Sequence, residues 1–203
     1  MQTRIFSFTE SQNEGKVVAR ATSTMTNFSL CLFTLSLFSL TFTFQPFQVT
    51  SSGATIIDVC NKTPNPTQCE TCLRGDPKSA TADVRGLAFI SITCGTRDAD
   101  KLYTDTNNIY TNTKDRKLHN LLDSCWWRFL AARDNIDSAG RFLGEKGSDA
   151  AKQAINRDAI PQISFCSDLF KKNPNVTVPS NILDEVTVVS TDCQIILGIL
   201  SNI

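Results

Sequence analysis

The residues with the greatest chemical capacity in this chain are its cysteines. Cys69 and Cys72 are separated by two residues, a spacing found in redox pairs and in structural zinc sites. A structural zinc site needs four ligands, and the chain contains a single histidine, His119. We therefore expect no metal ion and no cofactor. A disulfide between Cys72 and Cys94 is the expected fate of these thiols, with independent free thiols as the alternative.

Hydrolytic catalysis would have to rely on His119, because no other side chain could serve as the imidazole base of a Ser–His–acid unit. The sequence has no Gly-x-Ser-x-Gly elbow and no glycine-rich phosphate loop. The charge is balanced, with 20 basic and 20 acidic residues, which gives no electrostatic basis for capturing nucleic acid. We predict a protein that binds a protein partner, not an enzyme and not a nucleic-acid-binding protein.

The first quarter of the chain differs in composition from the rest, since eight of the 13 phenylalanines precede residue 50. An uncharged segment over residues 28–44 follows Lys16 and Arg20 and precedes small residues at 51–54, an order typical of a secretory signal. A membrane anchor is the alternative, because a span needs about 20 apolar residues. Serines and threonines interrupt the segment, however, and no basic cluster follows it.

We therefore expect a leader with a cleaved signal peptide over residues 1–53 and one functional domain over residues 54–203, with no membrane contact after cleavage. Met25 is an alternative start of the chain. Export places the domain in an oxidising compartment, where cysteines form disulfides. Seven cysteines lie after residue 54, so at least one stays unpaired. Asn61 and Asn175 begin candidate glycosylation sequences, the first weakened by the nearby Pro64.

The domain divides into a short cysteine-bounded segment and four helical stretches. Between Cys60 and Cys69 lie two prolines and two asparagines, which predict a turn between two short helices that a disulfide could close. Apolar residues then recur at helical spacing from about residue 76 to 112, 118 to 139, 149 to 171 and 180 to 200. Pro161 should bend the third stretch, and Ser180 can cap the fourth. No alternation lasts long enough for a sheet.

Four amphipathic helices with short links predict an all-α, antiparallel four-helix bundle with a disulfide-closed helical hairpin at its N-terminus. Cys125 and Cys166 each lie on the apolar stripe of neighbouring helices. A disulfide between them would close a loop of about 40 residues and stabilise the fold by roughly 3–4 kcal/mol.

Trp126 and Trp127 point in different directions, because adjacent residues of a helix differ by about 100° around its axis. One indole can join the core while the other lies at the surface, where it could anchor a partner or stack on a sugar. The alternative is that both are partly buried between helices.

These residues resemble the plant invertase/pectin methylesterase inhibitor family over nearly the whole domain. The landmarks are the Cys60–Cys69 hairpin, the segment Asp76–Ala88, Leu122–Cys125, Cys166 and Cys193. The resemblance implies disulfides Cys60–Cys69 and Cys125–Cys166, an unpaired thiol at Cys193, and a helical hairpin on a four-helix bundle in the cell wall or vacuole. It also implies a protein that occludes the active site of its target enzyme and performs no chemistry of its own.

The sequence departs from the family where the target is recognised. Residues 147–151 read Gly-Ser-Asp-Ala-Ala where one type of invertase inhibitor carries Pro-Lys-Phe. Pectin methylesterase inhibitors commonly carry acids at the positions of Trp127 and Ala131, and only Asp134 keeps the usual acid. We expect Trp127 and Asp134 to contact a target. Pectin methylesterase is the first candidate, acid invertase the alternative, and a non-inhibitory secreted interaction module a further one.

Overall fold

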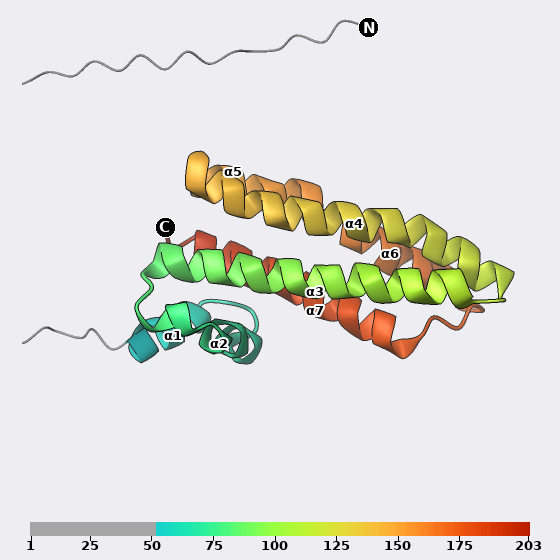
Figure 1. Ribbon diagram of the computed structural model, residues 1–203, viewed down its shortest axis with the longest axis horizontal. Helices are drawn as coiled ribbons and strands as arrows, with labels where there is room; N and C mark the ends of the chain where they lie inside the picture. Colours follow the sequence, from blue (N-terminus) through green and yellow to red (C-terminus); the bar gives the residue numbers. More distant parts are fainter. Residues whose placement is uncertain (1–51) are drawn as a thin grey trace, which may run out of the picture. The chain divides into compact units, whose positions relative to one another are not determined.

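The computed structural model describes residues 52–203, with side chains from residue 55. The leader expected over residues 1–53 lies outside this part, apart from its last two residues, and stays a prediction. Helices are the only regular secondary structure among the described residues, and loops join them (Figure 1). Their bounds are α1 Ser52–Cys60, α2 Pro66–Gly75, the 3₁₀ helix η1 Pro77–Ala80, α3 Val84–Asn112, α4 Arg116–Glu145, α5 Ser148–Gln153, the π helix η2 Ala154–Ala159, α6 Ile160–Lys172 and α7 Ser180–Leu200.

Helices α1 and α2 form the N-terminal hairpin that the prolines and asparagines predicted. Asn65 begins α2 as its N-cap, where its side chain accepts a hydrogen bond of 3.1 Å from the backbone N–H of Gln68. Pro66 follows in the first helical turn, where its missing N–H costs no hydrogen bond. Leu73 is fully buried under the hairpin. The hairpin packs against α3 and α7 of the bundle.

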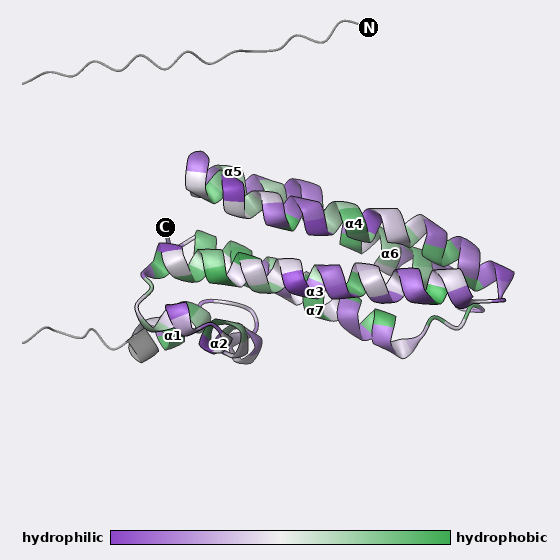
Figure 2. Ribbon diagram, in the orientation of Figure 1, coloured by the Kyte–Doolittle hydropathy of each residue, from purple (hydrophilic) through white to green (hydrophobic). Residues whose placement is uncertain are grey.

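Helices α3, α4, α6 and α7 lie side by side and make the four-helix bundle (Figure 1). Helix α3 packs against α4 and α7, and α6 packs against the same two helices. Short links join successive helices, which makes neighbours antiparallel. The predicted fold class is therefore confirmed. Figure 2 shows hydrophilic and hydrophobic residues alternating along these helices.

The apolar stripe of α4 forms the centre of the core. Its spacing at three and four residues places one side chain per turn against the neighbouring helices. All its members are buried: Leu118, Leu121, Leu122, Cys125, Phe129, Ala132, Ile136, Ala139 and Leu143. Gly147 then turns the chain toward α5 with a φ of 92°, which is favourable only for glycine, and its N–H donates to the Phe142 carbonyl.

The first long helix begins later than the sequence predicted. Asp76 caps only the short 3₁₀ turn η1, and α3 starts at Val84, capped by Asp83 through a 2.7 Å bond to the Gly86 N–H. Ala80, which lies within the helical stretch expected from about residue 76, is exposed. The reason is that Asp83 supplies a second cap after Thr81 has ended the 3₁₀ turn, and a new helix begins there.

The third stretch is interrupted more than a single proline bend implies. Six residues from Ala154 to Ala159 adopt π geometry between α5 and α6, and Pro161 lies in the first turn of α6. A proline inside an α-helix lacks a donor and clashes with the carbonyl four residues earlier. The wider turns of the π segment, just before Pro161, accommodate both effects while the chain remains helical.

Ser180 does not cap the last helix, so that prediction was wrong. Pro179 occupies the N-cap position, and Ser180 is the first helical residue with no side-chain capping bond. The Pro179 carbonyl accepts the Ile182 N–H at 3.1 Å. The extended ψ of Pro179, 135°, already directs its carbonyl into the first turn, so the backbone begins the helix without a side chain.

Three disulfides lie in the described part of the chain. They join Cys60 with Cys69, Cys72 with Cys94, and Cys125 with Cys166. The first closes the hairpin, the second ties α2 to α3, and the third ties α4 to α6. Cys193 is a buried free thiol, and its burial raises its pKa to about 12. Within residues 52–203, no helix combines the length and apolar character that crossing a bilayer requires.

Candidate functional site

The exposed side of helix α4 carries both residues expected to contact a target. Trp127 and Asp134 are seven positions apart, which is 20° short of two full turns, so they lie on the same side of the helix about 10 Å apart along its axis. Trp127 is 60% exposed, and the Asp134 side chain is 57% exposed. We call this side of α4, defined by Trp127 and Asp134, the outer face of α4.

Trp127 stands on a set of stacked aromatic rings. Trp126 is half-buried between α3 and α4, nearly parallel to Tyr103 at 5.6 Å and to Tyr110 at 6.0 Å between ring centroids. Trp127 lies 4.5 Å from Trp126, tilted by 51°. The structure thus separates the two tryptophans, with one indole between the helices and its neighbour exposed. Stacking limits the rotamers of Trp126 and gives Trp127 a rigid support.

His119 belongs to the same aromatic set. Its ring centroid is 4.4 Å from that of Tyr110. Partial burial raises the pKa of the Tyr110 phenol, and the charge of Asp123 raises it further. His119 therefore packs on the ring of Tyr110 as part of the contact between α3 and α4.

A charged cluster continues the outer face toward α3. Arg133 donates to Asp134 at 2.8 Å and bridges to Asp100 of α3 at 3.2 Å. Both carboxylates are about half exposed, so water or a partner can reach them. A shallow cavity of about 350 Å³ borders the cluster and is lined in part by Thr96 and Asp137. An exposed indole beside solvated charges is a common arrangement for a protein-binding surface.

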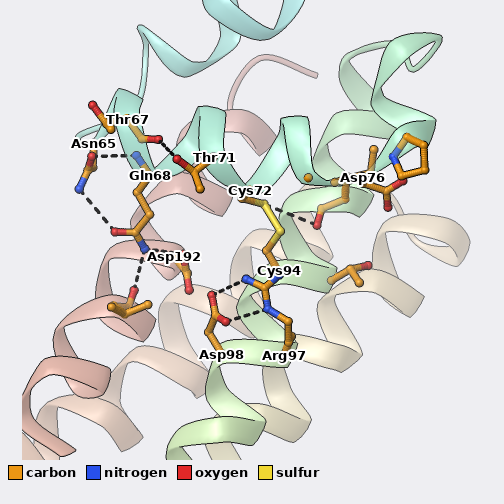
Figure 3. A pocket seen from close by; sticks show the side chains of 15 residues that line it. Asn65, Thr67, Gln68, Thr71, Cys72, Asp76, Cys94, Arg97, Asp98 and Asp192 are labelled. Carbon is orange, nitrogen blue, oxygen red and sulfur yellow. Dashed lines mark hydrogen bonds and ion pairs between the residues drawn. A yellow bond between two sulfur atoms is a disulfide. The ribbon is translucent and has the colours of Figure 1, made fainter. Parts of the chain in front are cut away.

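A cavity of about 660 Å³ lies where the hairpin meets the bundle (Figure 3). Gln68 of α2 reaches across it and donates to Asp192 of α7 at 2.6 Å. Arg97 and Asp98 of α3 also line this cavity and form a bidentate ion pair. Sequence analysis did not identify Asp192 as notable. The available signal was an acid beside Cys193 on the apolar stripe of α7, a position where carboxylates are seldom buried.

The Cys69-x-x-Cys72 spacing does not form a pair in the structure. Cys69 is bonded to Cys60 and Cys72 to Cys94, so both sulfurs are already engaged. Residues 55–203 contain no cluster of three or more histidine, cysteine or acidic side chains arranged to hold a metal ion.

The two candidate glycosylation positions are both exposed. Their threonines differ, however. Thr63, which follows Asn61, is buried and donates its hydroxyl to the Cys60 carbonyl at 2.7 Å. Thr177, which follows Asn175, is exposed in the loop between α6 and α7. Glycosylation remains a prediction, and Asn175 has the more accessible sequence.

The architecture defines a disulfide-bonded, all-α protein whose candidate site is a helix surface. The model of the plant invertase/pectin methylesterase inhibitor family matches residues 54–199, and the chain belongs to this family. The resemblance drawn from the cysteines and helices is therefore confirmed.

Relatives carry the names of two kinds of inhibitor. A pectinesterase inhibitor of Actinidia deliciosa is 27% identical over 148 residues, covering 73% of this chain and 78% of that protein. A cell wall/vacuolar inhibitor of fructosidase from Arabidopsis thaliana is also 27% identical, covering 85% of this chain and 97% of that protein. The family and these relatives are inhibitors of enzymes, not enzymes.

A solved structure agrees with the fold. The crystal structure of a mutant form of a pectin methylesterase inhibitor from Arabidopsis superposes with a TM-score of 0.62 at 22% identity. It covers 75% of this chain and 97% of the other. The likeness concerns the fold alone.

Proposed function

We propose that the protein is a secreted inhibitor that covers the active site of a cell-wall carbohydrate-active enzyme, with pectin methylesterase as the first target. The observation that carries the proposal is the exposed, rigidly supported Trp127 on the outer face of α4. A large aromatic side chain that loses little conformational freedom on binding is a frequent anchor of protein interfaces.

The charge pattern supports this surface. Asp134 and Asp100 share Arg133, so the surface presents two carboxylates and one guanidinium within reach of a partner. Such groups orient a partner and exclude wrong ones, more than they add affinity. Asp134 is also the one acid that this chain retains among those common in pectin methylesterase inhibitors.

Acid invertase is the second candidate target. The observation in its favour is that the fructosidase inhibitor of Arabidopsis matches along 97% of its length, more than the 78% of the Actinidia pectinesterase inhibitor. Sequence identity is 27% to both relatives, so identity by itself does not favour either target.

For the location we propose the cell wall, with the vacuole as the alternative. Three disulfides in the described domain fit an oxidising compartment. The name of the Arabidopsis relative includes both places. Cleavage of a leader before about residue 54 belongs to the same proposal.

Inhibition assays test the function. The purified protein is mixed with a panel of pectin methylesterases and acid invertases at mildly acidic pH, and residual activity is measured against inhibitor concentration. We expect tight inhibition of at least one pectin methylesterase. Unchanged activity across the whole panel, together with recovery of a receptor and no hydrolase from wall extracts, would support the non-inhibitory interaction module instead.

Variants connect the inhibition to the outer face of α4. Trp127→Ala should weaken inhibition by about 30-fold or more, equivalent to roughly 2 kcal/mol. Asp134→Asn should weaken it by a few-fold, mainly through slower association. Matched controls on other helices are Leu183→Ala, an exposed apolar residue of α7, and Asp168→Asn, an exposed acid of α6. Equal losses in variants and controls would contradict the assignment of this face.

A further inference from the structure

Two links fasten the hairpin to the bundle at one place, which we call the hairpin junction. It comprises Gln68 and Cys72 of α2, Cys94, Arg97 and Asp98 of α3, and Asp192 of α7 (Figure 3). The disulfide Cys72–Cys94 is the covalent link. The other link is Gln68, whose side-chain amide donates to Asp192 at 2.6 Å and to the Val188 carbonyl at 3.2 Å.

The surroundings of Asp192 leave one of its oxygens without a donor. Asp192 is only 4% exposed, although it is an acid. Oδ1 accepts from Gln68, whereas Oδ2 is buried and has no hydrogen-bond donor among the described residues. A second carboxyl, that of Asp98, lines the same cavity beside Asp192 (Figure 3), and its proximity is one of the causes that raise the pKa of Asp192. An ionised carboxyl is poorly solvated when one of its oxygens is buried without a donor, so this arrangement is unfavourable if both groups are ionised.

Arg97 is the counter-ion of only one of the two carboxyls, that of Asp98. Its guanidinium donates to both oxygens of Asp98, at 2.8 and 2.9 Å. Asp98 therefore has a counter-ion in direct contact. Asp192 has no such ion pair, and a proton on its unpartnered Oδ2 would be available for donation to the neighbouring carboxyl of Asp98. One proton thus satisfies the orphaned oxygen and removes the repulsion between two like charges.

We propose that Asp192 is held as a neutral carboxylic acid that donates to Asp98 while it accepts from Gln68, so that a single proton fastens the hairpin to the bundle at mildly acidic pH and its loss loosens the hairpin at neutral pH. The proton comes from solvent and returns to it, so no other reactant is needed. The device acts through the fold and is independent of which enzyme the protein inhibits.

The charged groups on all sides agree with this direction. Burial is the main cause that raises the pKa of Asp192, to about 7, and the neighbouring Asp98 adds to it. Gln68 and Arg97 act in the opposite sense and only reduce the effect. Asp76, after α2, also lines the cavity and adds negative charge, while the adjacent Cys193 thiol stays neutral. Because the pKa in the docked state is raised, docking is strongest below the ordinary pKa of an aspartic acid and is lost as the pH rises through about 7.

The disulfide limits how far the hairpin moves. Cys72 stays attached to Cys94 whatever the protonation state, so loss of the proton frees the Asn65–Gln68 end of α2 first. Removal of the disulfide should let the whole hairpin respond. The two links can therefore be separated with a Cys72→Ser/Cys94→Ser variant, in which docking depends on the proton and on apolar packing.

Infrared spectroscopy tests the proton directly. Protein with isotope-labelled aspartate should show the C=O stretch of a buried, protonated carboxylic acid at pH 5.5, and the band should vanish in Asp192→Asn. It should persist in the control Asp168→Asn, whose carboxylate is exposed on α6. A band missing from the wild type at pH 5.5, or one that Asp192→Asn leaves unchanged, would overturn the proposal.

Hydrogen exchange tests the consequence. After correction for intrinsic rates, exchange of the α2 amides in Cys72→Ser/Cys94→Ser should rise on the order of tenfold or more between pH 5 and pH 7.5. Asn at position 192 can accept from Gln68 and donate to Asp98 at any pH, so adding Asp192→Asn should remove the pH dependence while protection persists. An equal rise with and without Asp192→Asn would overturn the proposal. If the double-serine variant fails to fold, the same comparison with the disulfide intact, read at residues 65–68, decides.

Discussion

The outer face of α4 and the hairpin junction contain similar charged groups in different surroundings. At the outer face, Arg133 joins two carboxylates, Asp134 and Asp100, that are about half exposed. At the junction, Arg97 can satisfy only Asp98, and the second carboxyl, Asp192, is buried. Water solvates the carboxylates of the outer face, which remain accessible to a partner. At the junction water is excluded, so the carboxyl of Asp192 depends on neighbouring side chains, or on a proton, for its hydrogen bonds.

The comparison teaches that burial decides the state of similar groups: beside Arg133 two aspartates stay open to solvent, whereas beside Arg97 only Asp98 is paired and Asp192 is enclosed. The two regions also differ in what holds them in place, which is aromatic stacking at the outer face of α4 and a disulfide at the junction. Trp127 is exposed on a stacked base, so changing it should affect a partner more than the fold. The junction contains the Cys72–Cys94 disulfide, and the fully buried Leu73 follows Cys72, so changes there should affect the fold more than a partner.

The largest expected effect is on the packing under the hairpin. Leu73→Ala removes a fully buried side chain and should lower the free energy of unfolding by about 3 kcal/mol. Trp127→Ala, although it removes a larger side chain, should lower it by less than about 1 kcal/mol, because that side chain is mostly exposed. Urea unfolding followed by circular dichroism measures both. Equal losses would remove the distinction between the two regions.

The next effect concerns pH. The pKa of Asp192 is raised to about 7 in the folded protein, so folding binds a proton between about pH 4 and 7, and stability falls as the pH rises through that range. We expect about 1–3 kcal/mol of stability to be lost from pH 4.5 to 7.5 through this group. Thermal unfolding across the range should show this slope in the wild type and a shallower one in Asp192→Asn. An opposite slope would contradict the raised pKa.

Thiol labelling sharpens the comparison at the next level. Cys193 is fully buried beside Asp192, and its pKa is raised to about 12, so its reactive thiolate is scarce at pH 8. In the domain of residues 54–203, a thiol reagent should label less than about a tenth of the folded protein over a time that labels one thiol per molecule in urea. Rapid labelling of the native protein would show that the side of α7 behind the junction opens readily.

The smallest expected effects concern helix caps. Asp83→Ala removes the cap of α3 and should cost about 1 kcal/mol. Ser180→Ala should change stability by no more than a few tenths of a kcal/mol, because its side chain makes no capping bond. Both sites are exposed, so the pair isolates capping from burial. Unfolding midpoints of the two variants measure the difference, and a larger loss at Ser180 would contradict the structure.

The sequence by itself determined the helical architecture. The spacing of apolar residues from about 118 to 139 predicted a helix with one buried stripe, and α4 has it, because that spacing depends only on helix geometry. The turn between Cys60 and Cys69 was also predictable, since proline and asparagine restrict the backbone locally. Helix ends were less certain. The helix expected from about residue 76 begins at Val84 behind the cap Asp83, and α7 begins behind Pro179 without a side-chain cap, since a cap contributes only about 1 kcal/mol and the rest of the fold can override it.

Only the tertiary structure decided which groups share a site. The sequence indicated that one of Trp126 and Trp127 could be exposed, but the choice depended on Tyr103 and Tyr110, which α3 brings against Trp126. Likewise, the residues around Asp192 in the sequence do not predict its contact with Gln68, which is 124 residues earlier. Burial, and the pKa that follows from it, arises from contacts between distant segments, so it becomes visible only when the helices are assembled.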